Sequence, residues 1–466
     1  MNNFNCALVH TPQLCINKDT GSVFSNINFC AMGLYSLAKE LEKEGFNSEI
    51  IHLGVEKYLN EKFLLSDYIQ ENNIKFLAFS LHWHPQSYDV IETIRVVKEK
   101  CPSVFVTLGG FTSSYFAKEI LKKFPFVDAI IKGEGERPIR ELAKKVYKND
   151  KNLSSVPNIF WRKDNEIILN KEMFVATNED LNKYEFFNIK KLRNYETNAK
   201  MPFYLDYSKE YQLTNRPMSS QGVCLGRGCV GNCTWCGGGC EAMKLVTGRD
   251  FISYRNADNV LEEIKMLKNE CEIEDFRFAF DPDPSDREHL IILMEKIAKE
   301  FNGELKTSFT LNSLPDKRFL DVYKKAFSKG SIMSISPEFY SEDLRRTHKS
   351  FFYSNNELEE TLDYMEKLEL KSELYFSTLP MTTEKDNLAT ENYAKELNDR
   401  YKFVERYYVM PIVFEPAAPW TINPEKFELN ISVKTFIDYY NDTKCVEKSF
   451  ENIKLFPSKK AHSVCK

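Results

Sequence analysis

Three cysteines, Cys229, Cys233 and Cys236, stand at the spacing C-x₃-C-x₂-C directly before three consecutive glycines. Cysteine thiolates are the usual ligands of iron–sulfur clusters, and a cubane cluster normally takes four of them. Three thiolates would therefore hold three irons and leave the fourth iron open to a small molecule. The spacing thus predicts a 4Fe–4S cluster held by these three side chains.

Two other kinds of cysteine site fit parts of the same stretch. Cys224 and Cys240 flank the motif and could complete a zinc site, although zinc sites usually pair two short cysteine or histidine spacings. Cys233 and Cys236 form a C-x-x-C pair, which is also typical of redox-active thiols. Cysteines that only fill space do not fit, because five fall within residues 224–240 in a glycine-rich stretch.

With Trp235 just before the third cysteine, the motif resembles that of the radical S-adenosylmethionine (SAM) superfamily. In that family the open iron binds the methionyl amine and carboxylate of SAM, and reductive cleavage gives methionine and a 5′-deoxyadenosyl radical. The resemblance implies SAM contacts by Trp235, Gly237 and Gly238. It also implies an external electron donor such as flavodoxin or ferredoxin.

The composition is ordinary for a soluble globular protein. The 466 residues are 42% hydrophobic and 28% charged, which suits two to three domains. No apolar run reaches about eighteen residues and no cationic leader is present, so we expect no membrane span and no secretion signal. The net charge of −5 gives no sign of nucleic-acid binding. Twelve cysteines suggest a reducing, cytoplasmic location.

The first 150 residues alternate short apolar runs with amphipathic helical patterns. This alternation predicts a doubly wound parallel sheet, Rossmann-like or flavodoxin-like, over residues 1–150. Ligands of such sheets bind at the carboxyl ends of the strands. The expected strands are 7–10, 49–53, 76–80, 104–108 and 129–132, and the expected helices are 33–44, 87–100, 113–123 and 137–147.

Glycine-rich turns follow two of these strands. Gly109 and Gly110 lie between a strand and a helix, where glycine lets the backbone approach a ligand and the helix N-terminus can hold a phosphate. The turn 133–136 follows the last strand in the same way. A plain strand-to-helix connection is the alternative for both turns.

These turns, with Pro12 after the first strand and the helix opening at 32–38, resemble the cobalamin-binding domain that precedes the radical SAM barrel in one large subfamily. In that family the corrin lies over the carboxyl edge of the sheet. No D-x-H-x-x-G stretch is present, so histidine ligation of cobalt is not indicated. Ordinary loop packing is the alternative for residues 82–84. The residues implied to bind cobalamin are Pro12, His82, Trp83, His84, Gly109, Gly110, Thr112, Ser113, Gly133, Glu134, Gly135 and Glu136.

The second half resumes the alternation after a connector, 151–215, which holds a hairpin at 158–162 and 166–170. Six strand–helix units predict a partial (β/α)₆ TIM-type barrel over residues 216–420, and a short helical cap over 421–466. The cysteine loop follows the first barrel strand. The expected strands are 221–225, 276–280, 306–311, 332–336, 373–378 and 404–410, and the helices are 258–268, 286–299, 317–327, 356–368 and 387–400.

Four polar residues at the ends of barrel strands are candidates for holding SAM. Asp281 and Asp283 follow the second strand, with a simple Asp-Pro turn as the alternative. Ser336 and Glu338 end the fourth strand in a run similar to the cobalamin-type radical SAM subfamily, where a serine and a glutamate reach the ribose and methionyl parts of SAM. A salt-bridged surface glutamate is the alternative. The loop 414–419 fits the closing loop of the same subfamily.

The resemblance covers about residues 5–420 and implies an enzyme with three cofactors: a 4Fe–4S cluster, SAM and cobalamin. The implied reaction is methyl transfer from methylcobalamin to an unactivated carbon or to phosphorus of a small molecule or peptide. The same cofactors could instead support ring contraction, cyclisation or oxidation. A zinc-binding, non-catalytic cobalamin module is a third alternative. The sequence names neither the substrate nor a catalytic acid or base.

Overall fold

The computed structural model describes residues 4–208, 221–446, 449–451 and 453. Its N-terminal half is built on a seven-stranded sheet in the order β4-β1-β5-β6-β7-β8-β9. Five strands run parallel, and taken in chain order they are arranged second, first, third, fourth, fifth, which is the flavodoxin-like doubly wound order. The expected fold class is therefore confirmed. The parallel strands are β1 (Asn5–His10), β4 (Asn47–His52), β5 (Ile74–Ser80), β6 (Phe105–Gly109) and β7 (Ala129–Ile131).

Helices cover both faces of this sheet. On one face lie α1 (Gly33–Lys43) and α7 (Glu136–Tyr147), and on the other lie α3 (Leu65–Glu71), α4 (Ser87–Lys100) and α6 (Ala117–Lys123). Strand side chains alternate between the two faces, as Leu8 and Val9 do. The helix expected at 113–123 is two helices, because α5 (Phe111–Tyr115) ends before α6 begins. The short α2 (Leu53–Leu59) and α3 were not expected.

The expected hairpin is confirmed as β8 (Ile159–Lys163) and β9 (Glu166–Leu169). It does not stand apart in a connector, because β8 pairs antiparallel with β7 and extends the N-terminal sheet. After it come α8 (Asn178–Lys183), η2 (Ile189–Lys191) and α9 (Tyr195–Lys200). A second, small antiparallel sheet joins β10 (Leu205–Asp206) to β3 (Val23–Asn26) and β2 (Gln13–Ile16).

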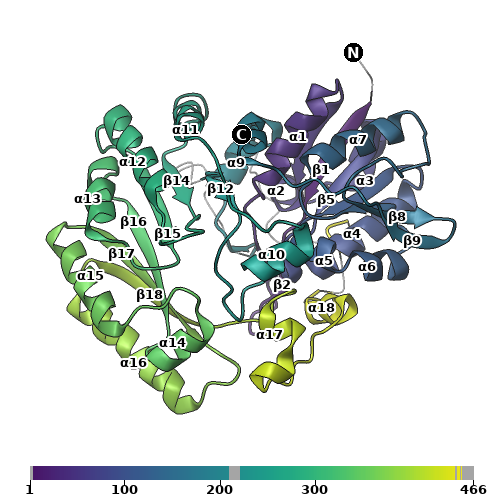
Figure 1. The fold of residues 1–466 in the computed structure, drawn as a ribbon. Helices are drawn as coiled ribbons and strands as arrows, with labels where there is room; N and C mark the ends of the chain where they lie inside the picture. The colour runs from purple at the N-terminus through teal and green to yellow at the C-terminus, as the bar shows by residue number, and fades with distance from the viewer. Residues whose placement is uncertain (1–3, 209–220, 447–448, 452, 454–466) are drawn as a thin grey trace.

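The C-terminal half holds six parallel strands that are hydrogen-bonded in chain order, and five helices pack outside them (Figure 1). This is the partial (β/α)₆ barrel that the alternation predicted. Its strands are β11 (Gln221–Gly222), β14 (Asp275–Phe278), β15 (Lys306–Leu311), β16 (Ile332–Glu338), β17 (Lys371–Thr378) and β18 (Val404–Pro411). The helices are α11 (Ala257–Cys271), α12 (Glu288–Phe301), α13 (Lys317–Ala326), α15 (Asn355–Lys367) and α16 (Glu384–Arg400).

Two helices and a small strand pair accompany the barrel without belonging to its repeating units. Helix α10 (Cys240–Thr247) follows the cysteine loop, and α14 (Glu342–His348) follows β16. The strands β12 (Gly226–Arg227) and β13 (Ser253–Tyr254) pair antiparallel on either side of α10 in the chain. All three features border the carboxyl ends of the barrel strands.

The C-terminal segment leaves the barrel and returns to the N-terminal half. It contains α17 (Pro419–Ile422), η4 (Pro424–Phe427) and α18 (Phe436–Asp442), and α18 lies beside α4 to α6 in Figure 1. Phe436 and Tyr439 are buried in the same hydrophobic core as the helix residues of α4. The Glu119 carboxylate accepts the N–H of Phe436 at 2.8 Å and so caps α18. The expected helical cap therefore rests on the first domain.

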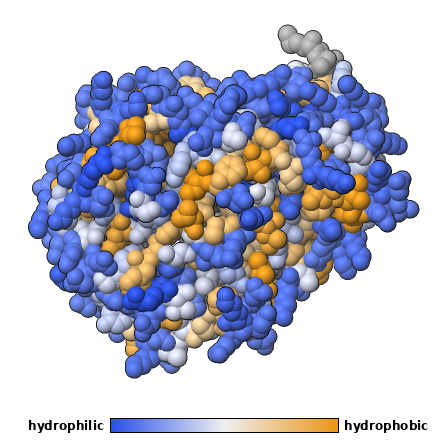
Figure 2. Space-filling view, in the orientation of Figure 1, coloured by the Kyte–Doolittle hydropathy of each residue, from blue (hydrophilic) through white to orange (hydrophobic). Residues whose placement is uncertain are grey.

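No helix among the described residues is long and apolar enough to cross a membrane. The surface in Figure 2 is mostly hydrophilic, but apolar side chains gather near the middle of this face, where the two halves meet.

Candidate functional site

Each of the three motif cysteines has a backbone N–H directed at its sulfur. Gly231 donates to Cys229 Sγ at 3.2 Å, Gly238 donates to Cys236 Sγ at 3.3 Å, and Ser350 donates to Cys233 Sγ at 3.4 Å. Such bonds stabilise negative charge on sulfur, which is the charge that a cluster-bound thiolate carries. All three side chains are partly exposed. The loop therefore presents three partly exposed thiols, each of which accepts a backbone hydrogen bond.

Neighbouring segments fix the shape of this loop. The Asn232 N–H donates to Ser350 Oγ at 2.6 Å, and the Thr234 side chain meets His348 Nδ1 at 3.0 Å. The Trp420 N–H donates to the Thr234 carbonyl at 3.1 Å. The loop is thus braced by the end of α14 on one side and by α17 on the other.

Burial raises the pKa of Cys236 to about 12, and the charge of Glu415 adds to the effect. Burial also raises the pKa of Cys229, and the hydrogen bond from the Gly231 N–H acts in the opposite direction. A cluster would supply the positive charge that these thiolates need. Among the described residues, no three His, Cys, Asp or Glu side chains lie close enough to share one metal ion.

Gly237 connects the cysteine loop to the end of the barrel. Its N–H donates to Glu415 Oε2 at 2.7 Å, and Glu415 is a residue of the closing loop 414–419. A Cβ on Gly237 would lie 2.5 Å from the Pro416 carbonyl oxygen, so only glycine fits here. Glu415 is a site residue that the local sequence pattern did not assign.

Ser336 and Glu338 lie at the carboxyl end of β16, beside a buried lysine. The Lys349 ammonium donates to the Ser336 carbonyl and lies 3.9 Å from Glu338 Oε1. Ser377 on β17 donates to Glu338 Oε2 at 2.6 Å. Glu338 has a φ of 67°, a left-handed conformation that is rare outside glycine and turns its carboxylate out of the strand pattern. Burial raises the pKa of Glu338, although the charge of Lys349 opposes this.

Asp281 and Asp283 have other partners in this structure. Both Asp281 oxygens receive hydrogen bonds from Arg287, at 2.9 and 2.7 Å, and Oδ2 also accepts the Asn312 N–H at 2.9 Å. Asp283 Oδ1 accepts from the Ser285 hydroxyl at 2.6 Å, as a turn residue does. The contacts favour the turn alternative, because these carboxylates hold the loops after β14 and β15 together.

The cysteine loop faces the carboxyl edge of the N-terminal sheet. Helix α10, which follows that loop, packs through Ala242 and Val246 against Phe111 and Tyr115 of α5. A Cβ on Gly133 would lie 2.9 Å from Thr247 Cα, so the turn after β7 also meets α10 closely. Ligands bound at the two carboxyl edges would therefore face one another.

Glu134 and Glu136 serve this domain contact. Arg227 donates to Glu134 Oε2 at 2.7 Å and is bonded to the Glu136 carboxylate, while Arg249 Nε donates to Glu134 Oε1 at 2.7 Å. Ser36 donates to Glu136 at 3.0 Å from α1. The arginine contacts give both carboxylates a structural role between the two halves, and cobalamin binding by Glu134 and Glu136 stays a prediction. Gly135 packs against Leu37 rather than facing open space.

The loops after β5 and β6 are joined into one edge. Thr112 Oγ1 donates to the His82 carbonyl at 2.9 Å, and Ser113 Oγ donates to the Gly110 carbonyl at 3.0 Å. Gly110, at a φ of 107°, has no room for a Cβ, which would lie 2.7 Å from the Leu81 carbonyl oxygen. The hydroxyls of Thr112 and Ser113 thus hold the backbone of these two loops in place.

An aromatic group borders this edge. The Trp83 ring meets His82 and Phe29, both at 4.8 Å between centroids, and Phe29 stacks on Phe203 at 5.6 Å. Phe29 is 40% and Phe203 55% exposed, so these rings present an apolar surface to solvent. His84 instead packs on Tyr439 at 5.1 Å, and burial lowers its pKa to about 4, so its ring is neutral at neutral pH.

The carboxyl ends of β1 and β6 have the properties of a ligand site. A Cβ on Gly109 would meet nothing within 4 Å, so open space borders the end of β6. Pro12 is buried, and next to it Thr11 Oγ1 and His10 Nδ1 are buried polar atoms with no partner among the described residues. A buried polar atom without a partner is costly unless a ligand or water completes it. This edge therefore fits a large polar cofactor.

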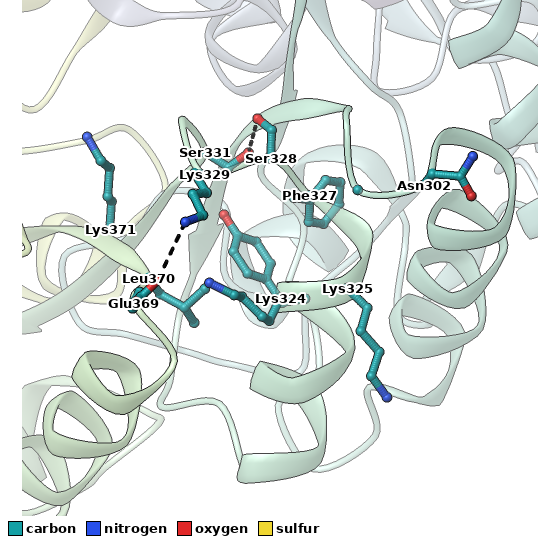
Figure 3. A pocket seen from close by; sticks show the side chains of 12 residues that line it. Asn302, Lys324, Lys325, Phe327, Ser328, Lys329, Ser331, Glu369, Leu370 and Lys371 are labelled. Carbon is teal, nitrogen blue, oxygen red and sulfur yellow. Dashed lines mark hydrogen bonds and ion pairs between the residues drawn. The ribbon is translucent and has the colours of Figure 1, made fainter.

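A hollow of about 250 Å³ lies at the opposite end of the barrel (Figure 3). It is bordered by Lys324, Lys329 and Lys371, near the amino ends of the strands. Lys329 is already paired with Glu369 at 3.6 Å. This hollow lies away from the cysteine loop and brings no chemistry to it.

Two family models match the chain. Residues 28–143 match the B12 binding domain, and residues 223–394 match the radical SAM superfamily. The order of these two matches agrees with the two halves of the structure.

Curated relatives align with about half of the chain or less. The anaerobic magnesium-protoporphyrin IX monomethyl ester cyclase of Rubrivivax gelatinosus is 24% identical over 52% of this chain and 40% of its own length. The uncharacterized methyltransferase PH0819 of Pyrococcus horikoshii is 21% identical over 53% of this chain and 48% of its own. The hopanoid C-3 methylase of Methylococcus capsulatus is 25% identical over 28% of this chain and 24% of its own. This chain thus spans less than half the length of these relatives.

A solved structure resembles most of the chain. The radical SAM methyltransferase TsrM from Kitasatospora setae, with tryptophan and a SAM analogue bound, superposes with a TM-score of 0.65 at 14% identity. The match covers 89% of this chain and 74% of that one. At this identity the likeness shows the shared fold of both halves.

Proposed function

We propose that this chain is a cobalamin-dependent radical SAM methyltransferase. The premise is that it is a member of the radical SAM superfamily with a B12-binding domain ahead of its radical SAM domain. Its proposed cofactors are a 4Fe–4S cluster, SAM and cobalamin. The proposed substrate is a small molecule or peptide with an unactivated carbon or a phosphorus centre. Because thiols and cluster need reducing conditions, we place the enzyme in the cytoplasm with a flavodoxin or ferredoxin as donor.

One observation carries the proposal: the three-thiol loop at the carboxyl edge of the barrel faces the ligand edge of the N-terminal sheet. The loop supplies three ligands, each with an N–H directed at its sulfur. Helix α10 and the Glu134–Arg227 contact hold the two edges together. Two cofactors that must act on one substrate need such a shared position.

When bound, the cluster and SAM would supply a 5′-deoxyadenosyl radical, and cobalamin would supply the methyl group. The chain's own residues would bind these cofactors and orient them. The cysteines Cys229, Cys233 and Cys236 would hold the cluster, and Glu338 with Lys349, at the carboxyl end of β16, would offer one negative and one positive group to SAM. Gly109 and the Trp83 ring would border the corrin, and the tight contact of the two halves would exclude water.

The names of some relatives support methyl transfer. The names of two relatives above, the hopanoid methylase and the Pyrococcus protein, are those of methyl-transferring enzymes. The cyclase of Rubrivivax supports ring formation as the second candidate with the same cofactors. S-adenosylhomocysteine separates the two, because methylation of cobalamin by SAM forms it and cyclisation does not.

The test uses anaerobically reconstituted protein with hydroxocobalamin, SAM and a strong reductant. We expect bound cobalamin, 5′-deoxyadenosine that is lost when the three cysteines become alanine, and S-adenosylhomocysteine. Cys224→Ala serves as the matched control, because Cys224 is buried outside the loop, and this variant should keep 5′-deoxyadenosine formation. Deoxyadenosine without S-adenosylhomocysteine would favour cyclisation or oxidation, and a single zinc without sulfide would contradict the proposal.

A further inference from the structure

Two cysteines that are 430 residues apart in the sequence lie together far from the cluster loop. Cys15 Sγ and Cys445 Sγ are 3.4 Å apart, which is a contact between two thiols, whereas a disulfide bond has a length of about 2.05 Å. Cys15 belongs to β2 and is 7% exposed, whereas Cys445 follows α18 and is exposed. The pair joins the N-terminal hairpin to the C-terminal segment.

The pKa values of the two thiols are shifted in opposite directions. The hydrogen bond from Cys15 lowers the pKa of Cys445 to about 7, which favours the thiolate form of this side chain. The same bond and burial raise the pKa of Cys15. An attacking thiol reacts best when its pKa is near the ambient pH, and it must be reachable from solvent. Cys445 meets both conditions, and Cys15 is the buried second thiol.

A buried carboxyl group lies beside the pair. Asp89 is 1% exposed, and its Oδ2 accepts the N–H of Leu14, the residue before Cys15, at 3.1 Å. Its Oδ1 is buried with no hydrogen-bond partner among the described residues. Burial raises the pKa of Asp89 well above its ordinary value, which favours the protonated form of this carboxyl group.

We propose that Cys15 and Cys445 form a redox-modifiable dithiol that reacts with low-molecular-weight disulfides. In the first step the Cys445 thiolate attacks one sulfur of the disulfide, forms a mixed disulfide and releases one thiolate. In the second step Cys15 loses its proton to solvent and attacks Cys445 Sγ, which forms the Cys15–Cys445 bond and releases the second thiolate. The protein dithiol is oxidised by two electrons, and the small disulfide is reduced to two thiols.

The bond would fasten the segment that borders the cluster loop. Tyr439 in α18, six residues before Cys445, donates its hydroxyl to the Phe414 carbonyl at 2.8 Å. The next residue, Glu415, accepts the Gly237 N–H beside Cys236. Oxidation would therefore lock the C-terminal segment onto β2 and hold the closing loop in place. This inference does not depend on the proposed reaction.

The test treats the anaerobically reconstituted full chain with glutathione disulfide at neutral pH. Free thiols are then alkylated in acid, and the digested peptides are identified by mass spectrometry. We expect a peptide in which Cys15 is linked to Cys445, lighter by two hydrogens than the sum of its parts, with the iron content unchanged. Cys15→Ser should stop the reaction at glutathione bound to Cys445, and Cys445→Ser should leave Cys15 unmodified.

Two further variants sharpen the result. Cys465→Ser removes the other cysteine near the carboxyl end, and it should form the same linked peptide as the unchanged chain. Asp89→Asn keeps the side-chain shape without an ionisable group, and it should also form the linked peptide. Three outcomes would each overturn the proposal. They are a bond between Cys445 and Cys465, a mixed disulfide that never resolves in the unchanged chain, and no reaction at Cys445.

Discussion

The backbone N–H of Gly237 donates to the partly buried carboxylate of Glu415 at 2.7 Å, across 178 residues of sequence. This bond joins the loop of the three cysteines to the loop that follows the last barrel strand. Burial raises the pKa of Glu415, and the Gly237 N–H opposes that rise. The first and last units of the open barrel are thus tied together at the site itself.

Gly237→Ala should abolish cluster assembly, because its Cβ would lie 2.5 Å from the Pro416 carbonyl oxygen and 3.2 Å from Glu415 Oε2. Gly238→Ala is the matched control, since the nearest atom to its Cβ is Cys236 Sγ at an ordinary 3.7 Å. Iron and sulfide per chain after anaerobic reconstitution measure the effect. Equal iron in both variants would show that the contact with the closing loop does not shape the cysteine loop.

Arg227→Met should destabilise the protein by about 3–5 kcal/mol, because it leaves the buried Glu136 carboxylate without its charged partner. Arg318→Met, which removes an exposed pair with Glu288, should change the free energy of unfolding far less. Urea unfolding monitored by circular dichroism compares them. A similar loss in both variants would mean that the domain contact contributes no more than a surface pair.

The same ion pair should make stability fall in acid. Burial opposes ionisation of Glu136, but Arg227 outweighs it and holds the pKa of Glu136 below its ordinary 4.5. A carboxyl group whose pKa is lowered on folding adds stability above its ordinary pKa, and this stability is lost as the pH falls below about 4.5. Urea midpoints of the unchanged chain should decrease over that range more steeply than those of Arg227→Met. Parallel curves would contradict this assignment.

Glu338→Gln should weaken SAM binding about tenfold, which corresponds to about 1.4 kcal/mol for a lost charge-assisted hydrogen bond. The amide keeps the shape and can still accept from Ser377, which now donates at 2.6 Å. Glu373→Gln, on the neighbouring strand β17 and already paired with Arg406, is the control. Equilibrium dialysis with the reconstituted protein measures both. An unchanged dissociation constant for Glu338→Gln would remove Glu338 from the SAM site.

Gly109→Val should abolish cobalamin binding while the protein still folds, because the space beside Gly109 is open in the chain itself. A β-branched residue is also acceptable at the end of a strand. Cobalamin absorbance that remains with the protein after desalting reports binding, and circular dichroism reports folding. A folded Gly109→Val protein with full cobalamin content would place the corrin elsewhere.

The sequence predicted the repeating elements of the fold well, because each produces its own periodic pattern. The bounds of β15 and α4 agree with expectation to the residue, and the order of all six barrel strands follows from simple alternation. The short helices α2 and α3 were missed, since seven residues give fewer than two turns of pattern. Helix α14 was missed too, although Ser341 caps it and could have indicated its start.

Site residues that depend on distant partners were less predictable. Glu134 and Glu136 looked like ligand-facing residues of a turn. The neighbouring sequence gives no sign that Arg227 and Arg249 form hydrogen bonds at this turn. Lys349 is buried beside Ser336 only because α14 turns back over the strand ends. The three cysteines were identified because one short loop contains the whole ligand set.

The central claim is that one chain holds a cluster and cobalamin at facing edges, and elemental analysis tests it most directly. The full chain is reconstituted anaerobically with iron, sulfide and hydroxocobalamin, desalted, and analysed for iron, sulfide, cobalt and zinc. The account predicts about four irons and four sulfides, with one cobalt, per chain, and loss of the iron but not the cobalt when Cys229, Cys233 and Cys236 are replaced by alanine. One zinc without sulfide, or a chain that retains no cobalt, would contradict it.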